Sequence, residues 1–222
     1  MDLCCGQGTL TAAITTIAAE VTGLDFSPEM IAMAKTSAPD AQIVQGNAMD
    51  MPFDDALFDK VICNYGMMHI PDQPKTLAEI QRVMKPDGIF TMATWAGPPS
   101  SPAFLAVFGA LKAYADFSAA PPQPDLFAFA DQEQAKAMMA DQGLELMEHG
   151  TVTSEWVLDQ PGELFEIFLT ATVGAGMLIR SQTKDTIQKI SEATKEFVSG
   201  KCRDGSKYRV PVVTAVLSAR AA

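Results

Sequence analysis

A glycine turn and two carboxylates near the start of the chain are the residues whose types and spacing predict chemistry. Gly6 and Gly8 form a G-x-G turn that follows a short apolar strand and precedes an amphipathic helix. Glycine has no Cβ, so it can adopt the positive φ of a sharp turn and let a ligand approach the backbone closely. The first N–H groups of the following helix point into the same space. We therefore expect the turn to bind a ligand.

The second feature is Asp25, which ends the segment 20–25 that we interpret as the next strand. In a βαβ unit, a carboxylate at this strand end accepts hydrogen bonds from a ribose diol. A dinucleotide site prefers a third glycine, but Thr11 occupies that position. Asp2, four residues before Gly6, would repel a pyrophosphate and attract a cation. These residues favour S-adenosylmethionine, a positively charged adenosyl cofactor, over NAD.

Five segments in the first half of the chain resemble motifs of the class I S-adenosylmethionine-dependent methyltransferases. They are D-x-x-x-G-x-G at 2–8, D-x-S-x-x-M at 25–30, a variant of G-D-A-x-x-x-P-F at 46–53, F-D-x-V to H-x-P-D at 58–72, and a variant of K-P-G-G at 85–88. Within that superfamily the chain is most similar to the small-molecule methyltransferases of the ubiquinone and menaquinone biosynthesis type. The resemblance is specific over residues 2–95, and it departs from the family at Asn47, where Asp is usual.

The resemblance implies an α/β fold with a Rossmann-like sheet and helices on both faces. The sheet would have seven mostly parallel strands in the order 3-2-1-4-5-7-6, with the last strand antiparallel and a helical insert after strand five. Hydrophobic periodicity and turn residues place the elements along the chain. The predicted strands are 1–4, 20–25, 41–45, 59–64, 89–95, 144–157 and 208–218. The predicted helices begin after Gly8 and after Ser27, and then cover 72–84, 104–111, 131–139, 161–172 and 183–199.

The length of 222 residues and the apolar content of 48% predict one methyltransferase domain over 1–222. Within it, 1–95 is the cofactor-binding half, 96–143 is a helical insert, and 144–222 carries the C-terminal strands and substrate-side helices. Pro121-Pro122 would form a hinge of the insert, which we expect to cover the site or to make a contact in a homodimer. The resembling family has helices before the first strand that are missing here, so we expect that the sequence is truncated or, as the alternative, that the insert takes over their closing role.

Two acidic residues carry the cofactor interpretation. Asp2 is expected to order the glycine turn and to accept a hydrogen bond from the methionine ammonium of S-adenosylmethionine. The alternative is a capping carboxylate that touches no ligand. Asp25 is expected to accept hydrogen bonds from the ribose hydroxyls, since hydrogen bonds to a carboxylate are about twice as strong as neutral ones. The alternative for Asp25 is an ion pair with Lys35.

The resemblance assigns the adenine ring to the segments that follow the second and third strands. Phe26 and Met30 are expected to flank the ring, with core packing as the alternative for Met30. Asn47 is expected to accept a hydrogen bond from the exocyclic amine, and the Ala48 N–H to donate one to a ring nitrogen. The complete set of expected cofactor-binding residues is Asp2, Cys4, Gly6, Gly8, Asp25, Phe26, Met30, Asn47, Ala48, Met49 and Asn64.

Two residues after the fourth predicted strand are candidates for catalysis. His69 is the candidate general base, and the alternative is a loop histidine that packs or caps the next helix. Tyr65 is expected to hydrogen-bond an oxygen of the methyl acceptor or to bury its ring. Methyl transfer often needs no enzyme base, so both assignments stay open.

Composition limits the partners of the protein. A net charge of −11 and a pI near 4.5 oppose binding to nucleic acid or to an anionic membrane, and fit a neutral or cationic small-molecule acceptor. Four cysteines without a C-x-x-C spacing, and only two histidines, indicate reduced thiols in the cytoplasm and no metal site. We also expect no membrane span, because the sequence has no run of about 18 apolar residues.

These observations predict an enzyme that transfers a methyl group from S-adenosylmethionine to a small-molecule acceptor by in-line displacement, giving S-adenosylhomocysteine. One alternative is a non-catalytic S-adenosylmethionine-binding partner subunit that keeps the fold without the chemistry. The other alternative is an NAD-dependent oxidoreductase, which the missing third glycine and Asp2 disfavour.

Overall fold

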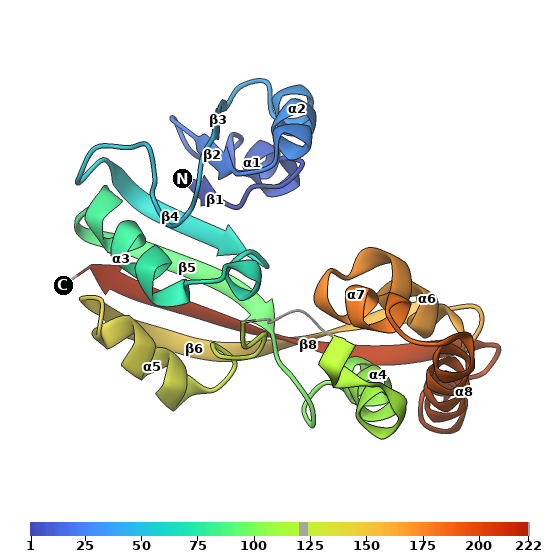
Figure 1. Ribbon diagram of the computed structural model, residues 1–222. Coiled ribbons are helices and arrows are strands. Elements are labelled where there is room, and N and C mark those ends of the chain that lie inside the picture. The colour runs from blue at the N-terminus through green and yellow to red at the C-terminus, as the bar shows by residue number, and fades with distance from the viewer. Residues whose placement is uncertain (120–123, 222) are drawn as a thin grey trace. The chain divides into compact units, whose positions relative to one another are not determined.

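The computed structural model describes residues 1–119 and 124–221, and its internal contacts divide the chain into two units (Figure 1). Unit 1 comprises Met1–Trp95, Pro124–Thr151 and Ala215–Ala222, and unit 2 comprises Ala96–Gln123 and Val152–Thr214. The proposed hinge at Pro121-Pro122 lies outside the described residues. The division into 1–95, 96–143 and 144–222, and the roles assigned to the insert, stay predictions.

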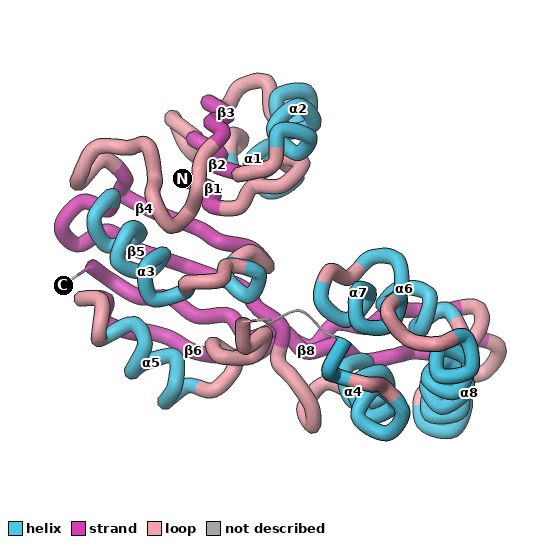
Figure 2. Tube along the Cα trace, in the orientation of Figure 1, coloured by secondary structure: helices cyan, strands magenta, loops and turns pink. Residues whose placement is uncertain are grey.

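The described strands form one eight-stranded sheet (Figure 2). Seven of them lie in the order β3-β2-β1-β4-β5-β8-β6, and β7 pairs with β8. This order confirms the predicted sheet and its antiparallel end, with β8 in the place of the predicted seventh strand. The strands of the order are β1 (Asp2–Leu3), β2 (Thr22–Asp25), β3 (Gln42–Gln45), β4 (Phe58–Asn64), β5 (Met84–Trp95), β6 (Leu144–Leu158) and β8 (Lys207–Ala221), and the added hairpin strand is β7 (Arg203–Asp204).

In unit 1, strands β1 to β5 run parallel to their neighbours, and helices connect all of them in sequence except β3 and β4, which a loop joins. The helices are α1 (Thr9–Ile14), α2 (Pro28–Ser37), α3 (Gln73–Val83) and α5 (Gln132–Ala140). Helix α1 packs beside α2, and α3 packs beside α5 in front of the sheet in Figure 1. Because crossovers between parallel strands are right-handed, and the chain leaves β1 and β4 in opposite directions across the sheet, α2 and α3 lie on opposite faces. The carboxyl ends of β1, β2 and β4 therefore meet where the chain changes direction.

The start of β5 differs from the prediction. We expected a helix to Met84 and a strand from Ile89, but α3 ends at Val83 and β5 already begins at Met84. Met84 pairs with Phe58, and the register then shifts before the next pair, which joins Lys60 to Ile89. The residues between the two pairs are accommodated as a bulge, so the turn residues that suggested a break lie inside the strand.

In unit 2, four helices pack on one another: α4 (Pro102–Tyr114), α6 (Glu163–Ala171), α7 (Gly174–Arg180) and α8 (Lys184–Lys201). Aromatic rings join α4 and α6, where the centroids of Phe104 and Phe168 are 5.4 Å apart. Helix α7 was not predicted. It packs through Gly176, where an added Cβ would lie 2.9 Å from the carbonyl oxygen of Leu169. Its buried residues Ala175, Leu178 and Ile179 do recur at helical spacing, but the helix is only seven residues long, which gives a weak pattern in the sequence.

Within the described part of the chain, none of the helices combines the length and the apolar character that a bilayer crossing requires. Two short 3₁₀ helices complete the described elements, η1 (Met67–His69) and η2 (Phe117–Ala119).

Gly8 fixes how α1 meets α2. It caps the amino end of α1 with a φ of 86°, in the left-handed region that favours glycine. A Cβ at this position would lie 2.9 Å from the Cα of Ala34, which is fully buried in α2. The second glycine of the turn is therefore required both by backbone conformation and by helix packing.

We predict that Gly8→Ala lowers the free energy of unfolding by about 1–3 kcal/mol, because the substitution strains the backbone and pushes against α2. Urea titration followed by circular dichroism measures this loss. Gly109→Ala is the matched control, since Gly109 lies in α4 and an added Cβ there meets no atom within 4 Å. That control should be neutral or stabilising by up to about 1 kcal/mol. Equal effects of the two substitutions would contradict the packing argument.

Candidate functional site

Asp25 joins the two loops that follow β1 and β2. Its side chain is buried, its Oδ2 accepts the N–H of Gly6 at 2.9 Å, and its Oδ1 accepts the N–H of Ser27 at 3.0 Å. Ser27 in turn caps α2, because its Oγ accepts the N–H of Met30. A carboxylate has about four acceptor positions. Two are used by the backbone here, so the carboxylate can still accept hydrogen bonds from hydroxyl groups of a ligand.

The turn between β1 and α1 leaves open space beside its first glycine. Cys4, Gly6 and Gly8 all have positive φ, at 58°, 54° and 86°. No atom lies within 4 Å of the position that a Cβ on Gly6 would occupy. The backbone of the turn is thus held in a fixed curve by Asp25, and its Gly6 face is open to a ligand.

Asp2 lies under this turn. Its side chain is 1% exposed, and its Oδ2 accepts a hydrogen bond of 2.6 Å from the hydroxyl of Thr11. Burial raises the pKa of the Asp2 carboxyl, the bond from Thr11 opposes this, and the nearby Asp25 raises the pKa further. The pairing of Thr11 with Asp2 was not predicted from the sequence. The role of Thr11 as the partner of Asp2 could have been suspected from its place one helical turn into α1.

The loop after β2 presents apolar side chains to solvent. Phe26 is 76% exposed and Met30 is 36% exposed, so neither packs in the core. The amide of Gln45 at the end of β3 donates to the carbonyl oxygen of Phe26 at 3.1 Å. This bond holds the backbone at Phe26, while Met30 is carried by the first turn of α2.

The loop after β3 carries the other residues expected at adenine. The side-chain oxygen of Asn47 accepts the N–H of Met49 at 2.9 Å, and its carbonyl oxygen accepts the N–H of Asp50 at 3.0 Å. Ala48 and Met49 are partly buried against the core of unit 1. Asn47 therefore shapes a tight turn with the same oxygen that was expected to bind the exocyclic amine.

The segment after β4 meets the glycine turn. An added Cβ on Gly66 would lie 2.5 Å from the Cβ of Cys4 and 2.7 Å from the Sγ of Cys63. Contact with Cys63 and burial both raise the pKa of the Cys4 thiol, which keeps the thiol protonated. The end of β4, with the exposed Asn64, is thereby brought beside the end of β1.

Tyr65 and His69 lie in this same segment. Tyr65 adopts a φ of 56°, and its ring centroid is 4.2 Å from that of Trp95 at the end of β5. His69 ends η1 and is exposed, while partial desolvation lowers the pKa of its imidazole below the usual value. A neutral imidazole can accept a proton near pH 7. Among the described residues, no group of three or more His, Cys, Asp or Glu side chains is placed to hold a metal ion.

The known proteins most informative about this chain are methyltransferases. A family model described as "Methyltransferase domain" matches residues 1–92. The demethylmenaquinone methyltransferase of Staphylococcus carnosus (strain TM300) is 33% identical over 165 residues, which cover 67% of this chain and 68% of that protein. The demethylmenaquinone methyltransferase of Staphylococcus aureus (strain JH9) is 32% identical over 160 residues, covering 64% and 66%.

The fold comparison agrees with the sequence comparison. A crystal structure of a candidate methyltransferase from Bacillus halodurans C-125 aligns with a TM-score of 0.67 at 21% identity, and covers 99% of this chain and 90% of that one. The motifs, the sheet order, and the identity shared with the staphylococcal enzymes all lead to one assignment. The chain belongs to the class I S-adenosylmethionine-dependent methyltransferases.

Proposed function

We propose that this enzyme transfers the methyl group of S-adenosylmethionine to a small aromatic acceptor of the hydroquinone class. The observation that carries the cofactor part is the buried Asp25 carboxylate, which holds the open Gly6 turn through a backbone N–H. The acceptor class is suggested by the names of the staphylococcal relatives. The net charge of −11 also fits a neutral ring better than a phosphorylated acceptor.

The residues present fit the cofactor. S-adenosylmethionine supplies an electrophilic methyl group on a positively charged sulfonium. In our proposal Asp25 accepts hydrogen bonds from the ribose hydroxyls, Asp2 orders the turn and attracts the methionine ammonium, and the exposed Phe26 and Met30 flank the adenine ring. Asn47 contributes through the turn that it shapes, with the Ala48 N–H directed to a ring nitrogen. The remaining members of the proposed cofactor set are Cys4, Gly6, Gly8, Met49 and Asn64.

The residues after β4 supply the groups that act on the acceptor. His69 would accept the hydroxyl proton of a hydroquinone on a ring nitrogen, because its lowered pKa keeps the imidazole neutral near pH 7. Loss of that proton raises the electron density of the aromatic ring and makes its carbon or oxygen a better nucleophile. Tyr65, stacked against Trp95, would hydrogen-bond the acceptor oxygen and orient the ring for in-line attack.

We predict that the enzyme methylates hydroquinones in preference to simple phenols, amines and carboxylates. Incubation with S-adenosylmethionine and a panel of these acceptors, followed by mass spectrometry, should show one equivalent of S-adenosylhomocysteine for each methylated hydroquinone. The matched control is the oxidised quinone, which has no hydroxyl proton to lose and should not react. Tight binding of S-adenosylhomocysteine without methylation of any acceptor would instead favour a non-catalytic partner subunit.

We predict that Asp25→Asn weakens binding of S-adenosylhomocysteine by about 10- to 100-fold, since a hydrogen bond to a charged group contributes about 1.5–3 kcal/mol. The asparagine keeps one acceptor oxygen for the glycine turn, so the fold should survive. Isothermal titration calorimetry measures the affinity. Asp40→Asn is the control, because Asp40 is exposed at the other end of the sheet, before β3. Unchanged affinity of the Asp25 variant would refute the assignment.

We predict that affinity for S-adenosylhomocysteine falls as the pH is lowered through the raised pKa of Asp2. A raised pKa means that the folded protein takes up this proton at a higher pH than a free aspartate does. The neutral carboxyl no longer attracts the ligand ammonium. Calorimetry from about pH 7 to about pH 4 should show the decline in the wild type. Asp2→Asn should bind weakly throughout and lack this step, and parallel pH profiles of the two proteins would count against the role.

A further inference from the structure

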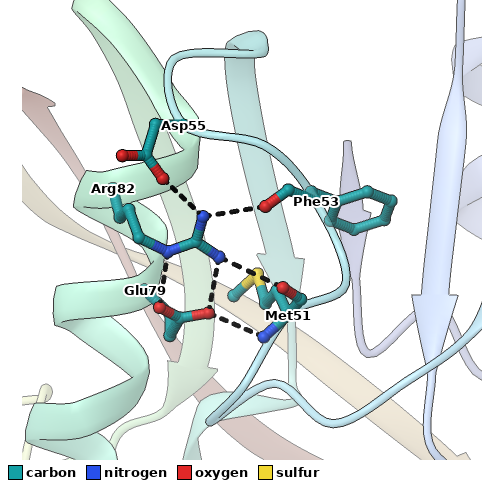
Figure 3. Close-up of polar contacts among 5 residues, drawn as sticks. All are labelled: Met51, Phe53, Asp55, Glu79 and Arg82. Atoms are coloured by element: carbon teal, nitrogen blue, oxygen red, sulfur yellow. Dashed lines mark hydrogen bonds and ion pairs between the residues drawn. The ribbon is translucent and has the colours of Figure 1, made fainter.

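We propose that Arg82 and Glu79 are positioning residues for adenine recognition, because they hold the loop that begins with Asn47. This inference rests on the proposed function, which assigns the 47–49 turn to the adenine ring. The two residues lie on α3, far from that turn in sequence, and they bind the second half of the same loop (Figure 3).

Arg82 binds two carbonyl oxygens of the loop. Its Nη1 donates to the carbonyl oxygen of Phe53 at 2.8 Å, and its Nη2 donates to that of Met51 at 3.1 Å. Nη1 also forms an ion pair with Asp55 at 2.7 Å. The Asp55 carboxylate is 78% exposed, so this ion pair contributes little. The two backbone contacts are what fix the course of the loop (Figure 3).

Glu79 binds the second backbone group of Met51. Its Oε2 accepts the Met51 N–H at 2.6 Å, and its two oxygens accept hydrogen bonds from Nε and Nη2 of Arg82 at 2.7 and 2.8 Å. The bonds from Arg82 hold the pKa of Glu79 below its ordinary value, so the pair stays ionised at neutral pH. Both backbone polar groups of Met51, whose side chain is buried in the core, are therefore bound by side chains of α3.

Direct packing connects Met51, which the α3 side chains bind, to the turn at Asn47. Pro52 lies between Met51 and Phe53, whose backbone groups bind to Arg82 and Glu79. The ring of Pro52 contacts Gly46. A Cβ on Gly46 would lie 2.9 Å from the Cδ of Pro52 and 2.7 Å from the Cδ1 of Leu24 in β2. Gly46 immediately precedes Asn47. The α3 pair thus fixes the Met51 end of the short segment that carries the turn at 47–49, and Pro52 packs against its other end at Gly46, whose N–H donates to the carbonyl oxygen of Asp25 at 2.9 Å.

The fork of an arginine is required for this geometry. A guanidinium offers five N–H donors in a plane, and here they reach two carbonyls and two carboxylates at once. A hollow of about 300 Å³ lies beside Arg82 and is also lined by Gln81 and Lys85. The Arg82 side chain itself is 31% exposed, so a free guanidinium ion can reach the position of its head when the side chain is removed.

The test uses Arg82→Ala and two probes, S-adenosylhomocysteine and S-inosylhomocysteine, in which hypoxanthine replaces adenine. The Ala48 N–H can donate to N1 of adenine but not to the protonated N1 of hypoxanthine, so the wild type should prefer the adenine ligand. If the loop holds its binding geometry in only about a tenth of Arg82→Ala molecules, affinity for S-adenosylhomocysteine falls about tenfold. Calorimetry should also show that the preference over the inosyl ligand shrinks towards equality.

Rescue by free guanidinium distinguishes a positioning role of Arg82 from a general loss of structure in the variant. About 10 mM guanidinium chloride, far below denaturing concentrations, should restore both the affinity and the preference of Arg82→Ala. Arg209→Ala is the matched control, because Arg209 also pairs with two carboxylates but lies in unit 2. Arg209→Ala should leave the affinity for both ligands unchanged. If Arg82→Ala does not fold, Glu79→Gln carries the test through the affinity for S-adenosylhomocysteine and the preference over the inosyl ligand alone, since it removes one charge and leaves the guanidinium in place.

The outcomes distinguish the inference from the function on which it rests. A wild type that binds both probes equally would overturn the adenine assignment of the 47–49 turn, and this inference with it. A wild type that prefers adenine, together with a variant that keeps the full preference, would overturn the positioning role alone. Loss of preference in the variant with guanidinium rescue would support it.

Discussion

The structure of the site depends on one buried carboxylate that is held by backbone N–H groups. An ionised carboxylate removed from water is stable only where donors replace the lost hydration. Asp25 receives such donors from Gly6 and from Ser27, which belong to two different loops. The requirement that the charge be satisfied thus fixes the loops after β1 and β2 against each other. The curve of the glycine turn is therefore set before any ligand arrives, which reduces the ordering that binding requires.

A second buried acid makes this end of the sheet favourable for a cation. Asp2 is almost fully buried, and burial together with the nearby Asp25 raises the pKa of its carboxyl. Thr11 compensates in part through its hydroxyl, where a dinucleotide-binding turn would have glycine. The unfavourable field that remains is relieved by a positively charged ligand and made worse by a pyrophosphate. In our proposal these residues therefore select S-adenosylmethionine over a dinucleotide.

The sequence predicts the site best where its determinants are local. Gly6, Gly8 and Asp25 are recognisable because a turn between a strand and a helix needs these residue types at fixed spacing. The boundary of β5 depends instead on pairing with Phe58 across the sheet, and α7 depends on the close approach of Gly176 to α6. Contacts between Arg82 and the loop join residues some thirty positions apart, and no local pattern encodes them.

The distribution of similarity along the chain bears on the acceptor class. The family model matches residues 1–92, the part of the chain that contains the glycine turn and Asp25. Identity to the demethylmenaquinone methyltransferase covers 67% of this chain and so extends well past that point. Similarity to that enzyme is therefore not confined to the part of the chain that the general methyltransferase model describes, and this is what supports the hydroquinone class that we propose for the acceptor.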